Sequence, residues 1–250
     1  MGIKERRTKI LLAFLLLSDK DFTDVELTAS IASIFDLSLN KKTASTLKKM
    51  SKEGFLTDKG LSDTGSPIYR LTDLGFDDVS LQFPFFRYQR HEWDNKWRIL
   101  SYEIPEKKRE LRDKLRREVA GWGLGPWHRS FWITPHPIIP SLQALVSKKE
   151  EEQYIQAFES SHVFGDREIL IEKVWQKAKR EQTYKKVFKK WHDILSTDQD
   201  KDKKFSAVIN EYISVLRDDP GLPKEVMGDN WIGFEAFTLF KEIRKILLGR

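Results

Sequence analysis

Basic and hydroxyl-bearing side chains are concentrated in one short segment near the start of the chain. Five lysines and several short hydroxyl side chains lie there against a single acid, Glu53. The residues are Lys41, Lys42, Thr43, Ser45, Thr46, Lys48, Lys49 and Lys52. Lysines neutralise DNA phosphates, and short hydroxyl groups can hydrogen bond to the edges of bases. The segment therefore predicts a DNA-contacting surface, although alone it also fits an ordinary solvated lysine face.

The residues around this segment are typical of a helix-turn-helix. An apolar run, Ile10 to Leu17, predicts a buried first helix. The capping-box pattern from Thr23 to Glu26 predicts that a second helix starts there and runs to about Phe35. After a short turn, a third helix is expected from about Leu39 to Glu53, with Gly54 as its left-handed C-cap. The buried face of this lysine-rich helix is expected to hold Ala44, Leu47 and Met50.

A β-hairpin is expected directly after the third helix. Phe55 to Lys59 and Ile68 to Thr72 have the composition of strands, and Gly60 to Pro67 is a turn-rich loop between them. A helix-turn-helix followed by a hairpin is the winged variant of the DNA-binding motif. Lys59 and Arg70, which lie on the expected hairpin, therefore join the predicted DNA contacts.

The middle of the chain alternates strand and helix patterns. Trp97 to Ile104 has the length and composition of a strand, and a charged amphipathic helix with Leu111, Leu115 and Val119 follows it. A second strand is expected from Ser130 to Thr134, a helix around Ile138 to Lys148, and a further strand from Tyr154 to Glu159. This order predicts a small open-faced sheet of ferredoxin type.

The remainder of the chain is predicted to be helical. Asp166 can cap a helix from Arg167 to about Lys179. Three more helices follow, each with an aromatic or apolar stripe at helical spacing, and Asp218 to Pro223 is a proline-rich turn between the last two. Such stripes usually form a core, and the helices could enclose a ligand pocket.

The composition limits the compartment and the chemistry. The chain of 250 residues has no cysteine, which excludes disulfides and thiolate metal sites and fits a reducing cytoplasm. Its net charge of +6 permits an anionic partner without requiring one. The apolar run from Ile10 to Leu17 is too short to span a bilayer and lacks a signal-peptide cleavage site. We therefore expect a cytoplasmic protein without a membrane partner.

No residue pattern points to an enzyme. The five histidines, at positions 91, 128, 136, 162 and 192, lack zinc-ligand spacing. The glycines at 121, 123 and 125 precede a predicted strand, whereas a phosphate-binding glycine loop precedes a helix. We therefore predict no catalysis, no bound metal and no resident cofactor.

Several segments together resemble the PaaX-type transcriptional regulators. The resemblance covers essentially the whole chain and rests on Trp93–Trp97, Ile104–Glu106, Leu111–Arg116, Trp132–Pro135, Asp219–Pro223 and Asp229–Gly233. It implies a homodimeric repressor that binds double-stranded DNA at a partly palindromic operator and is released by a small-molecule effector of acyl-CoA type. Gln176 departs from the family pattern, which often has an acidic residue after the tryptophan. That departure bears on the effector more than on DNA binding.

An alternative function comes from the same middle domain, which also resembles the ferredoxin-like CRISPR-associated nuclease. In that nuclease an aspartate at the end of the first strand holds a metal ion, and the matching residue here is Glu103. A glutamate can ligate magnesium, but its longer side chain displaces the carboxylate. The ordinary interpretation is an exposed carboxylate near Arg98 or Lys107. The alternative is therefore a metal-dependent nuclease that relies on Glu103.

The sequence thus predicts an α+β protein with three modules and a connector. Residues 1–80 form a winged helix-turn-helix, 81–96 a connector, 97–176 a ferredoxin-like central domain and 177–250 a helical C-terminal domain. The predicted function is transcriptional regulation by DNA binding.

Overall fold

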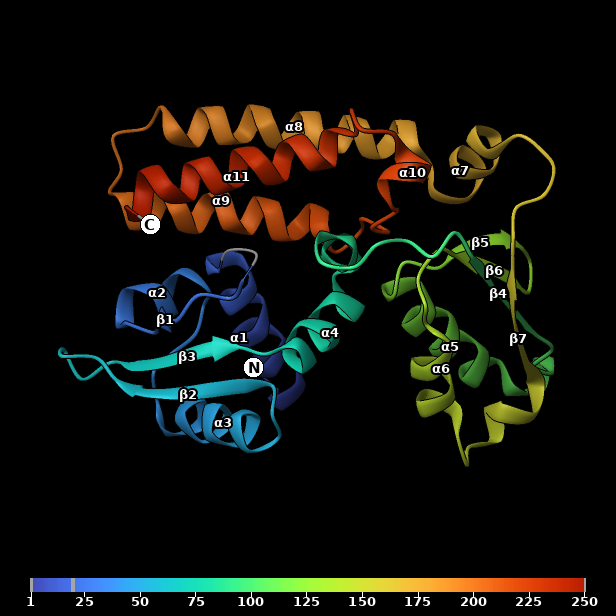
Figure 1. The fold of residues 1–250 in the computed structure, drawn as a ribbon, viewed down its shortest axis with the longest axis horizontal. Coiled ribbons are helices and arrows are strands. Elements are labelled where there is room, and N and C mark those ends of the chain that lie inside the picture. Colours follow the sequence, from blue (N-terminus) through green and yellow to red (C-terminus); the bar gives the residue numbers. More distant parts are fainter. Residues whose placement is uncertain (1, 19–20, 250) are drawn as a thin grey trace. The chain divides into compact units, whose positions relative to one another are not determined.

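Two compact units make up the chain. The computed structural model describes residues 2–18 and 21–249 (Figure 1). One unit contains the chain up to Ser80 together with residues 186–214 and the segment from Glu235 onward; the other contains residues 81–185 and 215–234. Helices and two antiparallel sheets give the α+β class that the sequence predicts. The domain boundaries near residues 80, 96 and 176 stay predictions.

The first unit begins with a winged helix-turn-helix (Figure 1). Its helices are α1 (Ile3–Leu17), α2 (Ala29–Ile34), α3 (Lys41–Lys52) and α4 (Asp73–Gln82). Its strands are β1 (Val25–Glu26), β2 (Leu56–Leu61) and β3 (Pro67–Leu71), in the antiparallel order β1-β3-β2. The predicted hairpin is therefore present, and Tyr69 and Leu71 point from β3 into the core. This confirms the winged helix-turn-helix fold.

The predicted start of the second helix is wrong. Val25 and Glu26 form strand β1 and pair with Tyr69 and Ile68 of β3. Helix α2 begins only at Ala29, where the hydroxyl oxygen of Thr28 accepts a hydrogen bond from the backbone N–H of Ile31 at 3.2 Å. Val25 is 2% exposed, so pairing with β3 buries a β-branched side chain that suits a strand. That tertiary contact overrides the local capping signal.

Helix α3 is fixed at both ends by its own sequence. The side-chain oxygen of Asn40 accepts hydrogen bonds from the backbone N–H groups of Lys42 and Thr43, at 3.0 and 3.1 Å. The helix ends before Gly54, which adopts φ +83° as predicted. Asn40 therefore sets the first residue of α3 at Lys41 rather than Leu39.

The C-terminal helices are α7 (Arg167–Trp175), α8 (Lys177–Leu195), α9 (Lys201–Leu216), α10 (Lys224–Met227) and α11 (Ile232–Leu248). The carboxylate of Asp166 caps α7 as predicted, by accepting from the N–H of Ile169 at 3.1 Å. The single helix expected from Arg167 to Lys179 is instead broken at Gln176, whose φ of +52° is left-handed. This break separates α7 from α8.

Parts of these helices belong to the same unit as the winged helix. The buried Arg244 of α11 donates two hydrogen bonds from Nη1, to the carbonyl oxygens of Leu16 and Ser18 at 3.0 and 2.9 Å. The hydroxyl of Ser206 in α9 donates to the carbonyl oxygen of Ile34 at 3.3 Å. Helices α9 and α11 thus supply hydrogen-bond donors to carbonyl groups at the ends of α1 and α2. Such carbonyl groups lie beyond the reach of the N–H groups of their own helix.

The second unit contains a four-stranded antiparallel sheet. Its elements are β4 (Trp97–Tyr102), α5 (Arg109–Gly121), β5 (Gly125–His128), β6 (Phe131–Thr134), α6 (Ile139–Val146) and β7 (Ile155–Ser160). Short 3₁₀ helices lie at Pro84–Gln89, Glu106–Lys108 and Glu150–Tyr154. The strand order β5-β6-β4-β7 is that of the ferredoxin-like fold and confirms the prediction.

Strand β5 was missed by the sequence analysis, which placed Gly125 before the strand expected from Ser130 to Thr134. Gly125 pairs with Ile133 of β6, so β5 and β6 form a hairpin. Helices α5 and α6 cover one face of the sheet, where Leu100, Trp132 and Val119 are in the core (Figure 1). None of the helices within residues 2–18 and 21–249 is long and apolar enough to cross a membrane.

Gly121, the last residue of α5, and Gly125, the first residue of β5, allow a matched test of this packing. A Cβ at Gly125 would lie 2.0 Å from Cγ1 of Val174, whereas a Cβ at Gly121 would meet nothing within 4 Å. Gly125→Ala should lower the free energy of unfolding by about 1–3 kcal/mol because α7 cannot move without losing its contacts with β5. Gly121→Ala should leave it unchanged or raise it by up to about 1 kcal/mol. Urea denaturation of both variants measures the difference, and equal stabilities would contradict this packing.

Candidate functional site

Helix α3 presents one lysine-rich face to solvent. Its exposed residues include Lys41, Lys42, Ser45, Lys48, Lys49 and Lys52, all of which the sequence analysis selected. The structure therefore brings these six predicted residues together on a single helix. Lys41, Ser45, Lys48 and Lys52 recur every three or four residues, which places them on the same side of the helix. They therefore form one continuous surface that can face a DNA duplex.

The predicted division of faces is wrong at three positions of α3. Thr43 and Thr46 were expected on the outer face but are buried, at 1% and 8% exposure. Ala44 was expected inside and is exposed. The buried residues Thr43, Thr46, Leu47 and Met50 follow the i, i+3, i+4, i+7 spacing of a helix stripe. Hydropathy could not reveal this, because two members of the stripe are threonines; the hydroxyl of Thr46 is satisfied by the carbonyl oxygen of Lys42 at 2.8 Å.

The acid beside the lysines is neutralised within the same unit. Glu53 accepts a hydrogen bond from Nη1 of Arg7 at 2.5 Å and lies 3.8 Å from Nζ of Lys49. The hydrogen bond from Arg7 holds the pKa of Glu53 below its usual range. The guanidinium of Arg7 also lies 4.8 Å from the ring centroid of Phe55. The outer face of α3 therefore keeps an excess of positive charge.

A groove between α1 and α3 extends this charged surface. Gly2, Ile3, Arg6 and Arg7 of the N-terminal segment line it together with Lys41, Lys42, Ser45, Thr46 and Lys49, and its volume is about 570 Å³. Its lining contains cations and no carboxylate. The sequence analysis missed Arg6 and Arg7 as site residues, although the basic start of the chain was a usable signal. This groove can accept a phosphate group.

The two predicted contacts on the wing lie in different surroundings. Lys59 is exposed on β2. Arg70 of β3 forms an ion pair with Asp24, with Nε 2.7 Å from Oδ1. At the turn of the wing, the hydroxyls of Ser62 and Thr64 both donate to Oε1 of Glu26 at 2.7 Å. The DNA contacts assigned to Lys59 and Arg70 stay predictions.

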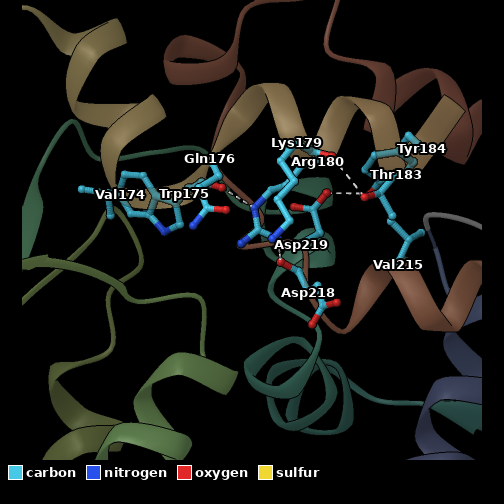
Figure 2. A pocket seen from close by; sticks show the side chains of 10 residues that line it. All are labelled: Val174, Trp175, Gln176, Lys179, Arg180, Thr183, Tyr184, Val215, Asp218 and Asp219. Carbon is cyan, nitrogen blue, oxygen red and sulfur yellow. Dashed lines mark hydrogen bonds between the residues drawn. The ribbon is translucent and has the colours of Figure 1, made fainter. Parts of the chain in front are cut away.

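A second candidate site is a pocket where α7 meets α8 (Figure 2). Its volume is about 320 Å³. Its lining residues are Val174, Trp175, Gln176, Lys179, Arg180, Thr183, Tyr184, Val215, Asp218 and Asp219. The left-handed residue Gln176 turns the chain sharply, so that the end of α7 and the first turns of α8 line the same cavity. Sequence analysis anticipated a pocket among these helices but none of its residues.

Hydrogen bonds hold the polar side of this pocket (Figure 2). Asp219 is buried, and its carboxylate accepts from the hydroxyl of Tyr184 at 2.6 Å and from the N–H of Gly221 at 2.8 Å. Burial raises the pKa of Asp219. Arg180 donates from Nε to the carbonyl oxygen of Trp175 at 2.6 Å and from Nη1 to that of Asp218. Lys179 is exposed beside them, so its ammonium group is available to a ligand.

Beneath the pocket, a buried histidine holds the turn that contains Asp219. Nε2 of His136 lies 2.6 Å from the carbonyl oxygen of Pro220 and therefore carries the proton that it donates. The His136 ring stacks on Tyr88 with centroids 5.2 Å apart, and the hydroxyl of Tyr88 donates to the carbonyl oxygen of Pro135 at 2.9 Å. Burial lowers the pKa of His136 to about 3.

Glu103 lies at the position expected from the nuclease alternative. It is exposed and directly follows β4, and its backbone N–H donates to the carbonyl oxygen of Tyr154 at 3.0 Å. Arg98, one of its expected neighbours, instead binds Asp94 and Glu159, at 2.5 and 3.0 Å. Within residues 2–18 and 21–249, no three or more His, Asp or Glu side chains gather as a metal site.

Comparisons with known proteins match most of the chain to two domain families. The model of the PaaX protein central Cas2-like domain matches residues 90–169, and that of the PaaX-like protein C-terminal domain matches residues 175–250. Among solved structures, the uncharacterised protein Rv0674 from Mycobacterium tuberculosis aligns with a TM-score of 0.48 and 16% identity, over 89% of this chain and 92% of that chain. The comparison with curated proteins found no match.

The buried His136 predicts how stability depends on pH. Its pKa is lower in the folded chain than the value of about 6.5 expected when unfolded, so the unfolded chain binds the proton first. The neutral His136 therefore makes its full contribution to the stability of the folded chain above about pH 6.5. This contribution falls by about 1.4 kcal/mol per pH unit as the pH drops towards 3. His136→Asn should remove this dependence between about pH 6.5 and 5, whereas His192→Asn on α8 should keep it. Urea denaturation at several pH values provides the measurement, and equal slopes for the two variants would contradict the assignment.

Proposed function

The chain belongs to the PaaX family, and from this premise we propose that it is a DNA-binding transcriptional regulator that acts as a homodimeric repressor. One observation carries the proposal: a winged helix-turn-helix whose α3 exposes lysines along its outer face. Because each lysine is exposed, a duplex can approach without any rearrangement of the helix. Phosphate neutralisation by such residues supplies most sequence-independent affinity.

The position of the exposed residues on α3 suits a recognition helix. Lys41, Lys48 and Lys52 are spaced to follow one side of the helix over its length. Ser45 lies between them and carries a short hydroxyl group that can reach a base edge. Lysines would fix the helix on the phosphates of the major groove, while Ser45 would contribute to base recognition.

The groove between α1 and α3 and the wing support the same orientation. Arg6 and Arg7 line the groove with Lys41 and Lys42, so a phosphate beside the major groove would meet several cations at once. Lys59 lies on the wing, which in this motif follows the recognition helix along the duplex. A homodimer would place two such surfaces on a partly palindromic operator, with half-sites about one helical turn apart.

We further propose the pocket at the start of α8 as the site of an acyl-CoA-type effector. An acyl-CoA combines anionic phosphates with an apolar acyl group. Lys179 and Arg180 supply positive charge at the pocket, and Trp175 and Val215 supply apolar surface. The pocket is also lined by Asp218 and by Asp219, whose carboxylate is bound by Tyr184 and Gly221. Helix α8 continues to Trp191, which packs on Tyr212 and Phe240 in the unit that contains α3. A ligand that alters the start of α8 could thereby influence DNA binding.

The lysines of α3 provide the first test. A fluorescein-labelled duplex is selected from a random pool by the wild-type protein and titrated by anisotropy. Changing Lys41, Lys42, Lys48 and Lys49 to alanine should weaken binding by about tenfold or more, because phosphate contacts are lost. The slope of log K against log salt should fall by about 0.9 for each phosphate contact removed.

The control variant removes four lysines from another helix, so it loses the same amount of positive charge. Lys185, Lys186, Lys189 and Lys190 are exposed on α8, and their replacement by alanine should leave the affinity and its salt dependence close to wild type. Unchanged binding by the α3 variant, or equal weakening by the two variants, would contradict the assignment of α3.

The effector site is tested with acetyl-CoA, hexanoyl-CoA and phenylacetyl-CoA, with free CoA for comparison. Titration calorimetry should show binding of at least one thioester to the wild type, and Lys179→Ala should weaken it by about tenfold because a charge-assisted contact is lost. Lys186→Ala, two turns along α8, should bind normally. Absence of binding by all three thioesters would refute the acyl-CoA assignment and leave the DNA-binding proposal intact.

A further inference from the structure

Helix α3 has few side chains that can identify a base pair. Arginine, asparagine and glutamine make paired hydrogen bonds to guanine or adenine in the major groove, and lysine can also bind guanine. Residues 41–52, all of which the structure describes, include lysines but no arginine, asparagine or glutamine. Asn40 precedes the helix, and its Oδ1 already accepts from the N–H groups of Lys42 and Thr43, at 3.0 and 3.1 Å. It therefore cannot offer both of its amide atoms to an adenine.

Packing also removes the two threonines of α3 from its outer face. Thr43 and Thr46 are buried, and the hydroxyl of Thr46 donates to the carbonyl oxygen of Lys42 at 2.8 Å. Their methyl and hydroxyl groups therefore lie beyond the reach of a duplex. The other large apolar residues of the helix, Leu47 and Met50, are buried beside them.

Ala44 remains as an apolar side chain on the outer face. Among residues 41–52, all of them described, it is the one exposed residue with an apolar side chain. It lies three residues after Lys41 and four before Lys48, so these two lysines flank it along the helix. Ala44 also belongs to the first half of α3, and the first residues of a recognition helix are the ones that contact base edges.

We propose that Ala44 contacts the C5-methyl group of a thymine in each operator half-site and thereby helps to select the operator sequence. Thymine alone presents a methyl group in the major groove, and alanine is among the side chains that contact it. The contact removes both methyl groups from water, whereas a cytosine in the same position would place a polar amino group against Ala44. The inference deepens the proposed function and rests on it, because it requires α3 to enter the major groove.

The groove between α1 and α3 supports this placement of Ala44. Lys42, Ser45 and Lys49 line that groove, whereas Ala44 and Lys48 do not. With a phosphate of one strand in the groove, the flank of α3 that carries Ala44 is turned towards the base pairs. Phosphate binding and thymine recognition would therefore use opposite flanks of the same helix.

Leu39 offers a rival contact. It is apolar and 45% exposed, and it lies just before α3. It precedes the N-cap Asn40, so it lies outside the helical face that Lys41 and Lys48 share. Ala44 is therefore the better placed of the two, and a variant at each position separates them.

Deoxyuridine tests the contact from the DNA side. In the duplex selected by the wild-type protein, each thymine of the half-site is replaced in turn by deoxyuridine, which lacks the methyl group and keeps the base pairing. At one position, the replacement should weaken binding measured by anisotropy by about fourfold for each half-site, because one methyl group is no longer buried. This measurement uses the unchanged protein, so it does not depend on the folding of a variant.

Variants of the protein assign the contact to Ala44. In Ala44→Gly, the same replacement should change the affinity by less than about twofold, because the partner methyl group is absent. Ser45→Gly is the matched control, since it places a glycine at the next exposed position of the same helix. It should keep the wild-type ratio of affinities for the thymine and deoxyuridine duplexes, and Leu39→Ala should keep this ratio too.

Equal affinity of the wild type for the thymine and deoxyuridine duplexes at every position would overturn the inference, as would a selected half-site without thymine. An unchanged ratio in Ala44→Gly, or loss of the ratio in Leu39→Ala, would also overturn it. All these outcomes leave salt-dependent binding by the lysines of α3, and with it the proposed function, in place. A wild type that selects no duplex would instead refute the proposed function, together with this inference.

Discussion

A buried turn at Asp219 to Gly221 holds together the parts of the unit that contains the central sheet. The carboxylate of Asp219 binds the hydroxyl of Tyr184 on α8 and the N–H of Gly221. The carbonyl oxygen of Pro220 accepts from His136, just beyond β6. A Cβ at Gly221 would lie 2.1 Å from the carbonyl oxygen of Pro84, so only glycine allows this close approach to the connector. One turn thus ties α8, the connector and the sheet end to each other.

The pocket at the start of α8 depends on this turn. Asp219 forms part of its wall, and Arg180 reaches from α8 to the carbonyl oxygen of the neighbouring Asp218. The polar wall is therefore fixed by buried hydrogen bonds, which cost more to break than exposed ones because the separated groups stay out of water. The apolar wall comes from Trp175, whose indole N–H donates to the carbonyl oxygen of Gly123 at 3.1 Å. Residues that line this pocket therefore also hold the start of α8 in place.

The outer face of α3 and the pocket at the start of α8 differ in their physical character, and this separates their proposed roles. The outer face of α3 is cationic and suits phosphates. The pocket combines two cations, Lys179 and Arg180, and two acidic side chains, Asp218 and Asp219, with apolar walls, and suits a small ligand with both polar and apolar groups.

The sequence by itself determined the order of elements and the charge of α3. Hydrophobic periodicity and Gly54 placed that helix nearly correctly, since caps and stripes act within a few residues. The alternation of strands and helices predicted the ferredoxin-like domain for the same reason.

Only the tertiary structure decided which local signals prevailed. Val25 became a strand because β3 lay beside it, and Gly125 entered β5 because β6 could pair with it. The burial of Thr43 and Thr46 and the groove that Arg6 shares with α3 both depend on segments distant in the chain. The sequence around each residue does not predict these contacts, because burial depends on how distant segments pack together.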